Sequence, residues 1–217
     1  PQRPMTVTEG IYEIGNPELD VETGWGLEFG IDHERGWFRQ DVTWFANLFD
    51  SFLYPRNTGL PSARRNDLIE YQYDSADALF LGMESTMELV LSPQWMVRGA
   101  GSLVLAENLD EDRALELIPP FDGRMSLTWQ PEPFAFTARA VGAARQWRVG
   151  EFEDPTAAWL RLDLMSKVEF SWQGAFHVLT LSAVNVMDTS YRNHLSRVKI
   201  ILPEPGRNIS LVYRLYL

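Results

Sequence analysis

Residues 159–172 read Trp-Leu-Arg-Leu-Asp-Leu-Met-Ser-Lys-Val-Glu-Phe-Ser-Trp, with Leu160, Leu162 and Leu164 alternating with Arg161 and Asp163. A period of two is typical of a β-strand whose two faces meet different surroundings. Strands of globular sheets usually have about 5–6 residues, whereas a tilted strand that crosses a bilayer needs about 9–11. Alternation and length together favour a membrane-crossing strand.

The same alternation recurs along the chain and predicts an all-β protein. Nine candidate strands follow from it: 22–32, 37–50, 78–91, 95–106, 123–130, 134–144, 159–172, 175–186 and 208–217. Helical periodicity is not sustained anywhere. No stretch reaches the roughly 18 uncharged apolar residues that a spanning helix needs. Barrel strands alternate and would not produce such a stretch. We therefore expect an antiparallel meander of about nine long strands.

The connections between the candidate strands alternate strictly in length. The segments 33–36, 92–94, 131–133 and 173–174 read as tight turns, and the segments 51–77, 107–122, 145–158 and 187–207 read as long connections. Outer-membrane barrels have short periplasmic turns and long extracellular loops. The alternation therefore predicts short turns at one end of the sheet and long loops at the other.

Aromatic residues gather near the expected strand ends. Trp37, Phe38, Trp95, Trp129, Phe134, Trp172 and Tyr216 lie beside short turns or the C-terminus, and Phe49, Phe52, Tyr54, Phe80 and Trp159 lie near the long connections. Membrane interfaces select two such girdles. The alternative is that aromatic residues simply favour strands.

The polar faces of the expected strands are rich in charge. The eight apolar residues Leu79, Leu81, Met83, Leu160, Leu162, Leu164, Leu211 and Leu215 should lie on the outer, convex face, and Glu84, Glu88, Arg161, Asp163, Lys167 and Arg214 on the concave one. Ionised groups in a narrow, dry interior would each cost several kcal/mol of desolvation. A wet lumen or a polar plug avoids this cost, so the parent barrel should be large.

Composition excludes several classes of function. The chain has 30 acidic and 19 basic residues and a net charge of −11, which argues against nucleic-acid binding. It has no cysteine, so thiolate chemistry and cysteine-based metal sites are excluded. The acidic run in 107–122 does not have the spacing of an EF-hand calcium loop, and no nucleophile or phosphate-loop motif is present. We therefore expect neither an enzyme nor a cofactor or metal site.

Three segments resemble TonB-dependent receptors. Residues 13–22 resemble the family's GNPxLxPE run, with Asp20 and Val21 in place of Lys-Pro. Residues 184–197 are similar to its NLFDxxYRxHLSR stretch, and residues 204–208 to the PGRN that opens its last strand. The chain ends in Leu217 where family members usually end in Phe. The resemblance spans nearly the whole chain.

The resemblance implies a particular domain organisation. The family barrel has 22 strands around an N-terminal plug, so residues 1–217 would be the C-terminal portion of the transmembrane barrel. Residues 1–21 would be the remainder of an extracellular loop, and the plug and the TonB-contacting segment would lie outside this sequence. An odd number of strands with two free edges cannot close in a membrane. We therefore expect that these residues are not the complete functional unit.

The implied function is active import across the bacterial outer membrane, energised through TonB. The expected partners are the bilayer, lipopolysaccharide, TonB through the plug region, and a small-molecule or metal-chelate substrate such as a ferric siderophore. The alternatives are a passive porin or a structural barrel. A soluble carbohydrate-binding β-sandwich is a third reading, which fails if the apolar faces contact lipid.

The last long connection, 187–207, differs from the others in its positive charge. Arg192, His194, Arg197 and Arg207 are its candidate substrate-binding residues, since cations could hold an anionic ferric chelate. The alternative is that these cations pair with lipopolysaccharide phosphates or with neighbouring acidic loops.

Overall fold

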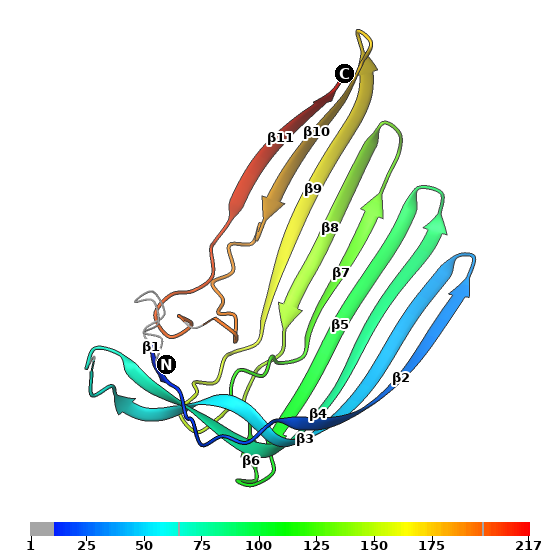
Figure 1. The fold of residues 1–217 in the computed structure, drawn as a ribbon. Coiled ribbons are helices and arrows are strands. Elements are labelled where there is room, and N and C mark those ends of the chain that lie inside the picture. The colour runs from blue at the N-terminus through cyan, green and yellow to red at the C-terminus, as the bar shows by residue number, and fades with distance from the viewer. Residues whose placement is uncertain (1–10, 65, 197) are drawn as a thin grey trace.

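The computed structural model describes residues 11–64, 66–196 and 198–217, which form one curved sheet (Figure 1). The strands are β1 (Ile11–Ile14), β2 (Thr23–Arg35), β3 (Phe38–Pro61), β4 (Ile69–Ser92), β5 (Trp95–Asn108), β6 (Arg113–Ala114), β7 (Asp122–Trp129), β8 (Phe134–Ala143), β9 (Trp159–Trp172), β10 (Ala175–Val184) and β11 (Asn208–Tyr216). Among the described residues, no helix is long and apolar enough to cross a membrane.

The sheet is an antiparallel meander. Its order is β11-β10-β9-β8-β7-β5-β4-β3-β2, with β1 and β6 attached at the side. Neighbours in sequence are neighbours in the sheet, as alternating turns require. The tight hairpins gather at one end and the long connections at the other (Figure 1). The predicted strand order and the predicted placement of turns and loops are confirmed.

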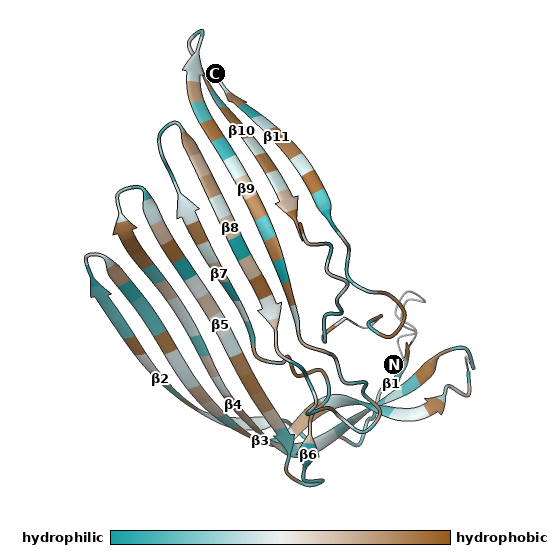
Figure 2. Cartoon of the chain, turned by 180° about the vertical axis from the view of Figure 1, so that it is seen from behind, coloured by the Kyte–Doolittle hydropathy of each residue, from teal (hydrophilic) through white to brown (hydrophobic). Residues whose placement is uncertain are grey.

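Strand register separates the two kinds of side chain as expected. One cross-strand row consists of Glu34, Arg39, Glu88, Arg98, Ser126, Arg139 and Asp163. The row one residue further along consists of Leu89, Val97, Leu127, Ala138, Leu164, Ala183 and Ile209. Successive residues point to opposite faces, so the sheet has one charged and one apolar face, and the banding in Figure 2 follows this alternation.

The eight apolar residues that we predicted for the outer face all lie on the apolar face of the sheet. The six charged residues that we predicted for the concave face all lie on the charged face. Leu160 is 61% exposed and Leu81 is 43% exposed. The leucines are therefore not packed into a closed interior, which removes the β-sandwich reading.

Residues 51–77 connect two strands as predicted, but the predicted strands on either side of this connection are too short. β3 and β4 continue through most of it as a long hairpin that swings away from the rest of the sheet (Figure 1). A register shift between Phe49 and Phe52 interrupts the alternation, and Ser51 there has a φ of 57°. A bulge of this kind hides a continuing strand from a search for strict period two. β1, in the segment expected to be loop, pairs in parallel with Ile69–Gln72 of this hairpin.

The expected aromatic girdle at the long-loop end is also wrong. Phe49, Phe52, Tyr54 and Phe80 pack against a small core of Ala78, Ala106 and Leu115. Phe49 and Phe80 fall in register with Asn108 and Ala106 of β5. Both of these β5 residues lie on the charged face of the sheet, so the two rings lie on that face as well. At the short-turn end, by contrast, Trp95, Trp129 and Phe136 stack on the apolar face, with ring centroids 5.8 Å and 5.5 Å apart.

Candidate functional site

Three loop segments fold over the charged face at the long-loop end of the sheet. We call 109–121, 144–158 and 185–207 the first, second and third loop segments. Leu115 of the first covers Ala78 and Ala106 of the sheet. In the third, the backbone N–H of Asn185 donates to Asp163 of β9 at 2.9 Å. Tyr191, also in the third segment, packs against Trp159 with ring centroids 4.1 Å apart. The loops are therefore anchored to the sheet rather than projecting freely.

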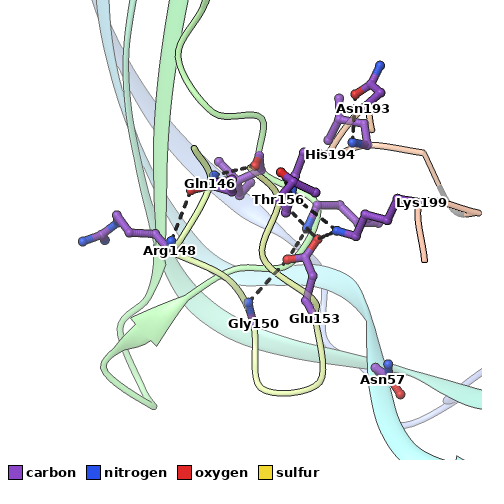
Figure 3. A network of polar contacts seen from close by, with 12 residues as sticks. Asn57, Gln146, Arg148, Gly150, Glu153, Thr156, Asn193, His194 and Lys199 are labelled. Carbon is purple, nitrogen blue, oxygen red and sulfur yellow. Dashed lines mark hydrogen bonds and ion pairs between the residues drawn. The ribbon is translucent and has the colours of Figure 1, made fainter. Parts of the chain in front are cut away.

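The carboxylate of Glu153 is where the three loop segments meet (Figure 3). It accepts hydrogen bonds from the backbone N–H of Leu117 at 3.2 Å and of Gly150 at 3.4 Å. Lys199 Nζ lies 2.9 Å and His194 Nε2 3.0 Å from its Oε1. The Glu153 side chain is 6% exposed, so this carboxylate is buried and shared by all three segments.

His194 has little exposure and a defined hydrogen-bonding role. Its Nδ1 lies 3.1 Å from the Thr156 hydroxyl and 3.4 Å from Lys199 Nζ. An ammonium group only donates, so Nδ1 is the acceptor and the ring proton belongs on Nε2, facing Glu153. Thr156 is itself held by two backbone hydrogen bonds to Gln146, at 3.0 Å and 3.1 Å. The imidazole is thus committed to contacts within the protein.

Two carboxyl groups of this region have displaced pKa values. Burial on its own raises the pKa of Glu153, but hydrogen bonds from His194 and Lys199 outweigh it and lower the pKa to about 2. For Glu116 burial dominates, and repulsion by Glu153 adds to it, so the pKa rises to about 7 despite the nearby Lys199 and Arg56. The two groups therefore differ in charge near neutral pH.

A second group of ion pairs joins the loops to the long hairpin. Arg56 of β3 lies 3.3 Å from Asp74 and 3.2 Å from Glu111. Arg113 pairs with Glu151 at 2.7 Å. These side chains are roughly a third to a half exposed, so each pair contributes little to stability. Their arrangement sets the orientation of the loops more than the energy of the fold.

The three predicted site residues that the structure describes lie in different surroundings. His194 is buried in the Glu153 network, and the Arg192 guanidinium donates to the backbone carbonyl of Lys199. Arg207 donates its backbone N–H to Asp188 at 2.8 Å. Arg197 lies outside the described residues. His194 pairs with Glu153 of a neighbouring loop, and so does Lys199, which was not among the predicted site residues. Pairing with neighbouring acidic loops was the alternative interpretation of the cations in 187–207.

Glu153 was missed by sequence reasoning. It lies in the long connection 145–158, and no motif marks it. The burial of His194 and Lys199 could not be predicted from the sequence either. It depends on the distance between segments 144–158 and 185–207, and the sheet sets that distance.

Below the loops, the charged face offers a polar wall. Arg98 pairs with Glu88 at 2.6 Å across β4 and β5. Arg39, Arg124 and Arg139 surround this pair along one hollow of the face and make no ion pair with a described residue. Guanidinium groups without protein partners require water or an anionic group. Such a wall suits a hydrated or plugged lumen rather than a dry core.

Taken together, an open meander of long strands, one apolar face, one charged face and loops gathered at one end define the wall of a large transmembrane β-barrel. The family model for the TonB dependent receptor-like β-barrel matches residues 3–187. The chain belongs to this family.

Relatives of known structure share the fold. A copper transporter, OprC, superimposes with a TM-score of 0.82 at 19% identity, over 92% of this chain and 32% of that one. The siderophore receptor PirA of Pseudomonas aeruginosa gives a TM-score of 0.65 at 18% identity, over 98% of this chain and 33% of that one. At these identities the likeness shows the fold alone. The chain spans about a third of each of these receptors.

A sequence relative is the ferrienterobactin receptor of Escherichia coli strain K12. It is 27% identical over 124 residues, which is 56% of this chain and 16% of the relative. The matched proteins with functional names are transport receptors.

Proposed function

We propose that this chain forms part of the wall and the ligand-facing loops of a receptor that imports a scarce nutrient across the bacterial outer membrane. The observation that carries the proposal is the family match over residues 3–187, together with three loop segments packed over the charged face. The apolar face would contact the bilayer, and the loops would meet lipopolysaccharide and substrate.

The proposed substrate is a ferric siderophore or another metal complex. The relatives' own names support this class, since they include a ferrienterobactin receptor, a siderophore receptor and a copper transporter. Energy would come from TonB through a plug region. Residues 1–217 would then be the C-terminal part of the barrel, a placement supported by the resemblance of 204–208 to the PGRN that opens the family's last strand. They span about a third of the solved receptors.

The test is uptake by cells that lack the native receptor gene and carry the full-length gene on a plasmid. Cells are grown under iron or copper limitation on a panel of ferric siderophores, ferric citrate and copper salts. We expect one metal complex to restore growth, and restoration to disappear when TonB is deleted. Restoration that persists without TonB would favour a passive porin, and no restoration by any metal complex would contradict the proposal.

A further inference from the structure

The buried contacts of Glu153 suggest a role beyond stability. Its carboxylate accepts from Leu117 of the first loop segment, from Gly150 of the second, and from Lys199 of the third. Each segment connects a different pair of strands. The three segments are therefore not neighbours along the chain, and only tertiary contacts can hold them together. One side chain therefore contacts all three loop segments at once.

Loss of this carboxylate would leave the buried Lys199 ammonium without its counter-charge and the His194 ring without its acidic partner. The Lys199 side chain is 10% exposed and the His194 side chain 1%. A buried charge whose partner is removed is strongly unfavourable. The third loop segment can avoid that cost by moving Lys199 into water, which separates it from the other two segments.

Glu116 of the first loop segment lies beside this network. It is faced by Glu151 and Glu153 of the second segment, by Lys199 of the third and by Arg56 of β3. Glu111 and Arg113 of its own segment line the same small cavity. The Glu116 side chain passes so close to Gly150 that a Cβ there would lie 2.1 Å from Glu116 Cγ. The Glu116 side chain is therefore packed against the second loop segment.

We propose that Glu153 is a positioning residue that holds the three loop segments together over the charged face, and that Glu116 makes this closed arrangement depend on pH. The proposal rests on the proposed function in one respect, namely that these loops capture the substrate. The loop geometry itself can be measured without any substrate.

The direction of the pH effect follows from the two carboxyl groups. The pKa of Glu116 is about 7 in the closed arrangement against an ordinary 4.5. Below pH 4.5 the carboxyl group is neutral in both arrangements and does not oppose closure. As pH rises to 7, ionisation of Glu116 favours the open arrangement and closure becomes progressively weaker. Glu153, with a pKa lowered to about 2, supports closure fully above 4.5 and loses this effect as pH falls through 2. Closure should be tightest near pH 4.5 to 5. It should weaken as pH rises from 5 to 8.

The experiment is electron-spin distance measurement on the full-length receptor in lipid nanodiscs. Spin labels are placed at Leu117→Cys and Leu195→Cys, which are exposed residues of the first and third loop segments. We expect one short distance at pH 5 and a growing population of longer distances up to pH 8. In Glu116→Gln the short distance should persist to pH 8. In Glu153→Gln it should be lost at every pH.

The matched control is Asp154→Asn, which removes an exposed carboxylate next to Glu153 and should behave as wild type. Heat-modifiable migration in gels identifies variants whose barrel has folded. If Glu153→Gln does not fold, Lys199→Met removes the same ion pair and should give the same loss. A Glu153→Gln profile equal to that of Asp154→Asn would overturn the positioning role, and a Glu116→Gln profile equal to wild type would overturn the pH dependence. Failure of the proposed function would appear separately, as normal loop distances without metal uptake.

Discussion

At the scale of single residues, Gly82 shows how the charged face accommodates a large ring. Gly82 of β4 pairs with Phe45 of β3, and a Cβ on Gly82 would lie 2.1 Å from Phe45 Cζ. The ring therefore lies directly over the glycine backbone. Gly30 of β2 is on the same face but has only Thr43 Oγ1 near, at 3.7 Å. The same residue type thus serves a packing role at one position and not at the other.

We expect Gly82→Val to lower the free energy of unfolding by about 1–3 kcal/mol, because the new side chain must displace the Phe45 ring. Gly30→Val is the matched control and should cost less than half as much. Urea titration of the full-length receptor in lipid vesicles, followed by tryptophan fluorescence, measures both. Equal costs at the two positions would show that backbone effects, rather than the Phe45 contact, control stability here.

At the scale of the strand, β9 tests the assignment of the two faces. Leu164 and Met165 are adjacent near the middle of β9 and have similar exposure, 45% and 39%. They lie on opposite faces, since Leu164 is in register with Ala138 and Ala183 while Met165 is in register with Thr137 and Ser182. Exposure alone cannot distinguish them.

Leu164→Lys should therefore destabilise the folded receptor by about 2–4 kcal/mol, the cost of a lysine on the lipid side near the bilayer midplane. Met165→Lys places the same charge on the hydrated face, beside Asp163, and should change stability by less than about 1 kcal/mol. Urea titration in vesicles measures the difference. A reversed order of the two costs would mean that the charged face is the lipid-facing one.

At the scale of the whole molecule, the sheet has two edges. Among the described strands, β2 pairs only with β3, and β11 only with β10. Unpaired backbone groups in hydrocarbon cost several kcal/mol each, so a spanning sheet must close. We therefore expect the edges of this sheet to pair with further strands of the same receptor.

Expressed alone, residues 1–217 should give no heat-modifiable, protease-resistant monomer and no substrate binding in detergent. The full-length receptor, treated in parallel, should give all three. A stable, closed, monomeric barrel from these residues alone would contradict the expectation and would favour a small-barrel architecture.

Much of this architecture follows from the sequence alone. Alternation of the kind seen at Leu160, Arg161, Leu162 and Asp163 depends only on the pleat of a strand, so it predicted strand positions, meander order and the two faces. The spacing of turn residues predicted which end carries the loops. The three motifs predicted the family. These features are local, and local chemistry encodes them.

The tertiary structure alone decided the rest. The bulge at Ser51 moves the alternation out of phase, so the hairpin beyond it could not be found from period two. Glu153, His194 and Lys199 belong to loop segments that the chain order keeps apart. Only the folded sheet brings these segments together and places Lys199 and His194 beside Glu153. Burial then makes an unpaired Lys199 charge unfavourable.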